Sequence, residues 1–270
     1  HPLTSERMAD MQSRQPLGKP GAASAAATLE HAMIAARARV LSNPGVDALR
    51  ALLAEAEGAK LASMAAPRQA GALYGAALAA SRLRDFPRAK LYLERLMALV
   101  PADAWALRLS RWLEAEIALS AGDAPRAAAV LNASPGGRNE GGADAAGPRR
   151  PELFLAVQLA LQTGQGAAAG EAAQRLQSWV AAHPRDAQAW QLLSSAYAAQ
   201  GQSLRAIRAS AETQVALLDY PAAVDRFRAA QELLRQGRAG NAAADHIEAS
   251  IIDTRKRQVE LLLKEQTLDR

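Results

Sequence analysis

The chain has 270 residues and a formal net charge of +5, which is enough length for one large domain or two small ones. Half of its residues are hydrophobic but only 4% are aromatic. The apolar residues are mostly alanine and leucine, whereas strands favour β-branched and aromatic residues, so the composition predicts an all-α fold. The chain contains no cysteine, which excludes disulfides and thiolate metal sites, and no apolar run reaches the ~18 residues of a membrane span.

The first 25 residues differ from the rest. Residues 1–15 open with His1 rather than methionine, which we take as a sign that the chain is part of a longer protein, and Thr4 is placed to cap a short helix. Residues 16–25 are rich in proline and glycine and predict a linker. We therefore expect a helical domain over residues 26–270.

Three helical hairpins are predicted before residue 132. The first joins helices over about 26–41 and 46–57 across a Pro-Gly turn. The second spans 70–101, with Ala89 where its two helices cross closely, and the third spans about 108–131, with Gly122 in the turn and Ala127 at the crossing. Residues 132–150 follow as a low-complexity stretch, which predicts a mobile insertion.

The next hairpin spans 153–184, with Ala172 in register. After it come Trp190, Leu193, Tyr197, Gly201 and Ala206. The first three lie three and four residues apart and share one helix face, the glycine suits a helix end, and the alanine suits a close crossing. This spacing resembles the tetratricopeptide (TPR) repeat, a helical hairpin of about 34 residues.

Residues 204–218 and 221–234 predict another hairpin. Its turn, Asp-Tyr-Pro, is similar to the Asp-Phe-Pro turn at residue 85. A last helix over about 243–264 has Ile247, Ile251, Val259 and Leu262 among its apolar positions, and we expect it to cap the stack. The expected fold is thus an αα-superhelix of TPR-like hairpins with a C-terminal capping helix.

A superhelix of this kind has a concave face lined by the first helix of each hairpin, which can hold a segment of another protein. Residues next to the core stripe should point into that groove. They are Tyr74, Trp112, Glu116, Gln191 and Ser195. Tyr74 and Trp112 could equally fill gaps between repeats.

Catalytic constellations are not found in the sequence. No two of the four histidines have the i, i+4 spacing of a helical metal pair, and His-Glu-x-x-His is absent. Residues 164–170 are glycine-rich but follow a helix, so we interpret them as a turn rather than a phosphate loop. We expect no catalysis and no cofactor in this chain. Nucleic acid is not an expected partner, because basic and acidic residues are interspersed.

Three segments resemble one family. Residues 1–11, the Arg-Ala-Arg-Val-Leu run at 37–41 and residues 246–255 are similar to the part of bacterial M48 metallopeptidases of the BepA type that follows their peptidase domain. The resemblance implies a TPR domain in the periplasm that assists outer-membrane assembly. It also implies that His1 can occupy the fourth position of the parent's zinc and so hold the enzyme inactive.

The expected function is therefore that of a protein-binding module, which holds client or outer-membrane assembly proteins for a catalytic domain that this chain lacks. Association with the outer membrane would then occur only through partners or the parent protein. The alternative is a stand-alone TPR scaffold with no link to proteolysis. The sequence leaves the oligomeric state open.

Overall fold

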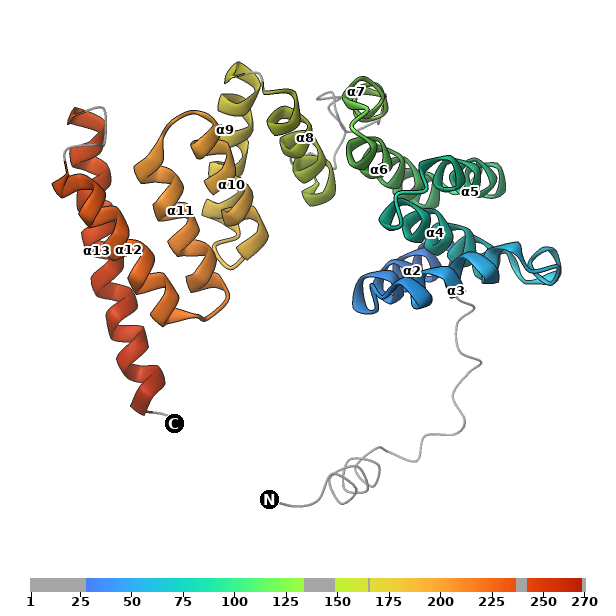
Figure 1. Ribbon diagram of the computed structural model, residues 1–270, viewed down its shortest axis with the longest axis horizontal. Helices are drawn as coiled ribbons and strands as arrows, with labels where there is room; N and C mark the ends of the chain where they lie inside the picture. The colour runs from blue at the N-terminus through green and yellow to red at the C-terminus, as the bar shows by residue number, and fades with distance from the viewer. Residues whose placement is uncertain (1–27, 134–148, 165, 237–241, 269–270) are drawn as a thin grey trace, which may run out of the picture.

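The computed structural model describes residues 28–133, 149–164, 166–236 and 242–268, and within these ranges the chain is entirely helical (Figure 1). The all-α prediction is confirmed. The α-helices are α2 (Leu29–Ser42), α3 (Val46–Glu57), α4 (Ala66–Arg82), α5 (Phe86–Leu99), α6 (Ala104–Ala121), α7 (Ala124–Asn132), α8 (Arg150–Thr163), α9 (Gly166–Ala182), α10 (Ala187–Ala199), α11 (Ser203–Ala216), α12 (Tyr220–Arg235) and α13 (Ala242–Leu268), with a short 3₁₀ turn η1 (Leu61–Ser63). The predicted segment 1–15, the linker and most of the insertion lie outside the described residues.

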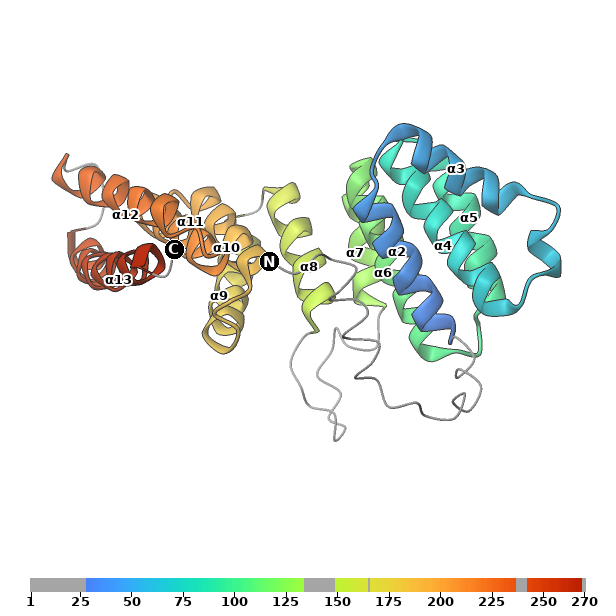
Figure 2. The same cartoon turned by 90° about the horizontal axis from the view of Figure 1, so that it is seen from below.

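The helices stack in chain order. Each of α2, α4, α6, α8 and α10 contacts the next member of this row. The last four also pack on a helix that directly follows or precedes them in the chain, whereas α2 and α3 both pack on α4. The stack bends into an arch that runs from α2 and α3 at one end to α13 at the other (Figure 1). The view from below separates a thick half built from α2–α7 from a thinner half built from α8–α13 (Figure 2).

One turn geometry recurs along the stack. Arg84, Gly122, Gly201 and Leu218 follow α4, α6, α10 and α11 and have φ of 64°, 81°, 71° and 63°. In each turn the next residue's N–H bonds to the carbonyl five residues back, as from Asp85 to Ala80 at 2.9 Å. This is the Schellman arrangement, which satisfies carbonyls left open at a helix end.

The same turns start the following helix. The carboxylates of Asp85, Asp123 and Asp219 accept a hydrogen bond from the backbone N–H three residues on, at 3.1, 3.0 and 3.1 Å. A proline follows two residues after each aspartate, where the helix needs no N–H donor. One short sequence therefore ends one helix and caps the next, which explains why the hairpin turns were predictable.

A buried alanine lies five residues after each left-handed turn residue. These alanines are Ala89, Ala127, Ala169, Ala206 and Ala223. Counted from Gly164, which has φ of 66°, the equivalent residue of the fourth hairpin is Ala169 and not the predicted Ala172. Ala172 is buried one helical turn further along α9. The predicted position therefore lies three residues too late in the chain.

Leu218→Gly should stabilise the protein. The Leu218 side chain is 63% exposed and its backbone is left-handed, a conformation that costs a non-glycine residue ~1–2 kcal/mol. Glycine loses more conformational entropy on folding than leucine does, which offsets part of this gain. We therefore expect the free energy of unfolding, measured in urea, to rise by ~0.5–1 kcal/mol. The control is Leu217→Gly: Leu217 is also exposed but has φ of −85°, so the same change there should destabilise. A loss of stability from both variants would contradict the prediction.

Four apolar cores fill the stack. A large core joins α2–α6, a second joins α8–α11 and a third joins α11–α13. The two halves meet through a small core whose buried members are Ala115, Val130 and Leu155. Of the apolar clusters among the described residues, the one at the junction of α6–α7 with α8 is the smallest.

The last helix differs in detail from its prediction. α13 runs from Ala242 to Leu268 and packs on both α11 and α12, as a capping helix should. Its buried apolar residues are Ile252 and Val259, whereas Ile247 and Ile251 are 67% and 37% exposed. The buried face is also polar, because Glu248 lies on it beside the arginines of α11.

Candidate binding surfaces

The predicted groove is closed over α2, α4 and α6. Tyr74 is only 3% exposed, so the prediction that it lines a groove is wrong. The cause is the close approach of α2 to α4 at Gly71, where an added Cβ would lie 3.0 Å from the carbonyl oxygen of Ala32. With α2 so near, α2 also contacts α6, and the two helices cover the face of α4 between them.

An ion pair ties the closed region together. The Arg37 guanidinium lies 2.7 Å from the Glu116 carboxylate and 3.4 Å from the Tyr74 hydroxyl. Burial raises the pKa of Tyr74, so its hydroxyl stays neutral. Burial acts to lower the pKa of Arg37, but the hydrogen bond and charge of Glu116 raise it above its ordinary value. Glu116 is thus half-buried and paired with Arg37, and it lines the hollow of about 470 Å³ at one end of the open surface described below.

Trp112 belongs to the junction between the halves. It packs against the small core of Ala115, Val130 and Leu155, and its indole N–H donates to Glu152 at 3.3 Å. It therefore fills space between α6 and α8, the second of the two roles that the sequence left open.

The concave face opens from α6 onward. Gln191 and Ser195 on α10, two of the predicted groove residues, are exposed, and the Ser195 hydroxyl donates to the Gln191 carbonyl at 3.3 Å. Gln158 and Gln162 on α8 are exposed beside them in the row. We call Ser120, Gln158, Gln162, Gln191 and Ser195 the concave strip; its side chains are uncharged and can donate and accept hydrogen bonds.

A shallow hollow lies at one end of this strip. It measures about 470 Å³ and is lined by the last turns of α4, α6 and α8. Arg84 donates to the Ser120 carbonyl at 2.8 Å and Gln162 to the Leu119 carbonyl at 3.1 Å, so both cover the open end of α6.

The sequence prediction missed Gln158, although it lies six residues before Gly164, as Ser195 lies six before Gly201.

A second hollow, of about 550 Å³, lies between α7 and α9. Its floor is the mostly apolar face of α8, with leucine, valine and alanine, and its walls are alanines of α7 and α9 together with polar residues that include Glu171 and Arg175. It exists because α7 has only 9 residues whereas α9 has 17, so part of the apolar face of α8 is left uncovered.

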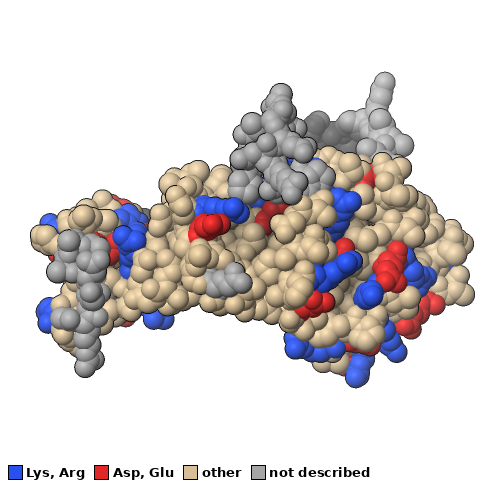
Figure 3. All heavy atoms as spheres, turned by 90° about the horizontal axis from the view of Figure 1, so that it is seen from above, with Lys and Arg blue, Asp and Glu red and all other residues tan. Residues whose placement is uncertain are grey.

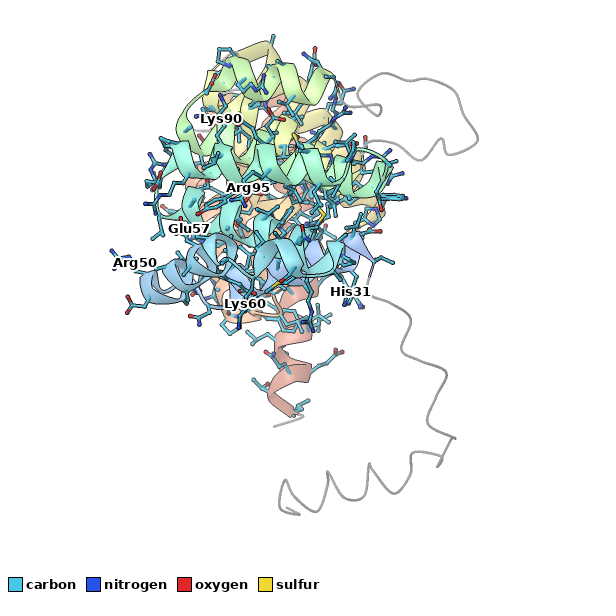
Figure 4. The ribbon with its side chains drawn as sticks, turned by 90° about the vertical axis from the view of Figure 1, so that its right-hand side faces the viewer. His31, Arg50, Glu57, Lys60, Lys90 and Arg95 are labelled. Carbon is cyan, nitrogen blue, oxygen red and sulfur yellow. The ribbon has the colours of Figure 1, made fainter. Side chains whose placement is uncertain are left out.

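Charged residues are mixed in sign over the thick half. Seen from above, charges gather over that half and at the far end, with a mostly uncharged surface between (Figure 3). Glu57, Lys60, Lys90 and Arg95 all belong to the side of the thick half that Figure 4 shows. Lys90 pairs with Glu94 and Arg50 with Asp47, each at 3.9 Å. Acidic side chains thus lie among the basic ones on that side.

The three described histidines lie on different helices or turns of the stack. His31 and His246 are exposed, and the His183 ring lies 4.2 Å from the Trp179 ring. Within the described ranges no three His, Asp or Glu side chains gather in a way that could hold a metal ion. His1, the predicted switch ligand, lies outside those ranges. None of the described helices combines the length and the hydrophobicity that a membrane span needs.

No protein-family model matches the sequence, and no curated protein shows significant similarity to it.

Proposed function

We propose that this chain is a protein-binding module of the TPR type, which holds an extended segment of a client protein along the concave strip. The observation that carries the proposal is the strip itself. Successive helices of one row present uncharged amide and hydroxyl groups, which can hydrogen-bond to the backbone of an extended chain whatever its sequence.

We further propose that the module belongs to a bacterial M48 metallopeptidase of the periplasm, whose clients are outer-membrane assembly proteins. The resemblance of residues 1–11 and 246–255 to that family supports this assignment. The zinc of such a parent would be held by a domain that this chain lacks, with His1 as the one residue here that could reach it.

The strip can be tested with a matched pair of variants. Gln174 and Ser178 on α9 are a matched pair for Gln191 and Ser195 on α10. Both pairs are exposed, have the same spacing, and have a serine hydroxyl that donates to the glutamine carbonyl at 3.3 Å. Gln191→Arg/Ser195→Arg should weaken binding of an unfolded β-barrel protein, diluted from urea and followed by fluorescence anisotropy, by about tenfold or more. Gln174→Arg/Ser178→Arg should leave binding unchanged. Equal effects of the two double variants would overturn the concave-strip proposal.

The parent can be tested in the native organism. An antibody to this chain should detect a band well above the size of 270 residues in the periplasmic or membrane fraction. A band at the size of the chain alone, with no larger precursor, would favour the stand-alone scaffold.

A further inference from the structure

A third hollow, of about 610 Å³, lies between α9 and α13, with α10 and α11 as its floor. Trp190, Leu193 and Tyr197 of α10 line it, whereas Gln191 and Ser195 of the same helix belong to the concave strip. At 100° per residue the two sets lie on nearly opposite faces of α10. A ligand in this hollow would not touch the concave strip.

The hollow exists because α11 pairs with two helices, α10 before it and α12 after it, instead of with one hairpin partner. α12 begins with the Asp-x-Pro-x-Ala signature that elsewhere marks the second helix of a hairpin. α11 therefore serves as second helix to α10 and as first helix to α12, and α13 then packs against α11. The first part of α13 forms a wall opposite α9.

The side of the hollow formed by α10 and most of its walls are apolar, whereas α11 contributes two arginines. Val180, Leu193 and Tyr197 are buried beneath the hollow, and Ile247 and Ile251 form one wall at a spacing of one helical turn. Ile247 is 67% exposed. Trp190 is half-buried, and its indole N–H already donates to the Pro184 carbonyl at 2.9 Å, so its ring is left for apolar contact. Exposed apolar side chains gathered round one hollow are typical of a binding site.

The hollow also carries a positive charge. Its charged lining residues are Arg205, Arg208 and Glu248. The Glu248 carboxylate, 6% exposed, accepts a hydrogen bond from Arg208 and lies 3.8 Å from Nε of Arg205. Two guanidinium groups thus face one carboxylate, which leaves one net positive charge. Arg205 is 41% exposed and lies 5.9 Å above the Tyr197 ring, so this charge is at the edge of the apolar floor.

We propose that this hollow binds the C-terminus of a polypeptide whose last side chain is large and apolar. A terminal residue carries a carboxylate and a side chain on the same Cα, so one residue can meet both Arg205 and the apolar walls. The terminal carboxylate pairs with the exposed guanidinium of Arg205. The last side chain packs between Trp190 and the two isoleucines. This site is additional to the concave strip and does not depend on it.

Two fluorescein-labelled hexapeptides test the proposal. Both read Gly-Ser-Gly-Ser-Ala-Phe, one with a free C-terminal carboxylate and one with a C-terminal amide, and each is titrated with the full chain by anisotropy. The free acid should bind about tenfold tighter or better, as expected for a charge-assisted hydrogen bond. Arg205→Met keeps the aliphatic stem and should abolish the difference between the peptides. Ile247→Ser should weaken both peptides.

The control is Arg228→Met on α12. Arg228 is an exposed arginine that pairs with Asp225 at 3.2 Å and is not part of the hollow's lining, so the preference for the free acid should survive. Equal affinity for acid and amide, a preference that survives Arg205→Met, or no binding at millimolar protein would each overturn the proposal. Gln191→Arg/Ser195→Arg should leave peptide binding intact, so failure at one site is distinguishable from failure at the other.

Discussion

Replacing Asp186 by alanine is expected to destabilise the protein by ~3 kcal/mol. This carboxylate, 12% exposed, accepts hydrogen bonds from Nε and Nη2 of Arg150 on α8 at 2.7 and 2.9 Å, and from the indole of Trp179 on α9 at 2.9 Å. It also caps α10 through the N–H of Ala189 at 3.2 Å. Alanine removes a helix cap worth ~1 kcal/mol and a charge-assisted network worth ~2 kcal/mol more. Urea unfolding at pH 7 measures the loss.

The same carboxylate should make the protein sensitive to acid. The hydrogen bonds from Arg150, and then those from Trp179 and Ala189, lower the pKa of Asp186 from 3.8 to about 2, against the opposing effect of burial. A carboxyl whose pKa is lower in the folded state contributes stability that is complete above its unfolded pKa. That stability is then lost as the pH falls from about 4 to about 2, and it amounts to ~2 kcal/mol.

Asp186→Asn isolates this effect, because the amide keeps the shape of the side chain but does not titrate. The variant should be less stable than the wild type at pH 7, and the difference should shrink below pH 4. Asp225→Asn is the control, since the Asp225 side chain is 74% exposed in its pair with Arg228 and should contribute close to nothing. Parallel stability curves for wild type and Asp186→Asn between pH 7 and pH 2 would contradict the prediction.

Glu212→Ala should detach α13 from α11. The Glu212 carboxylate is 7% exposed and accepts two hydrogen bonds from the Arg255 guanidinium, both at 2.6 Å. The bonds to Glu212 raise the pKa of Arg255 above its ordinary value, against burial. Breaking a buried pair by removing one partner costs ~3–5 kcal/mol. Because Arg255 is 34% exposed and can be partly hydrated, we expect ~3 kcal/mol in urea unfolding, with faster amide exchange in α13.

The stability lost in Glu212→Ala should come mainly from the unpaired charge of Arg255, rather than from the lost attraction between the two side chains. Glu212→Leu/Arg255→Met, which replaces the pair by apolar side chains of similar size, should recover most of the stability. A double variant as unstable as Glu212→Ala would show that the pair itself holds α13, and our account of its energetics would be wrong.

The sequence by itself determined the helices and most of their ends. α3 begins and ends where the sequence predicted, and the Asp-x-Pro turns at 85 and 219 cap helices as their residue types require. Gly122 and Gly201 are left-handed, as a helix end favours. These features depend on contacts within a few residues, so local propensity and hydrogen bonding decide them. The face shared by Leu193 and Tyr197 was predictable from periodicity for the same reason.

Only the tertiary structure decided which helix faces are covered. Tyr74 and Gln191 hold equivalent positions, ten residues before a left-handed turn residue, yet one is buried and the other exposed. The difference arises because Gly71 lets α2 approach α4 closely, whereas α8 packs less extensively on α10. In the same way, Ile252 of α13 is buried and Ile251 is not, because α13 packs on α11 as well as α12. Periodicity shows which residues share a face, but the neighbouring helix determines whether that face meets solvent, core or a ligand.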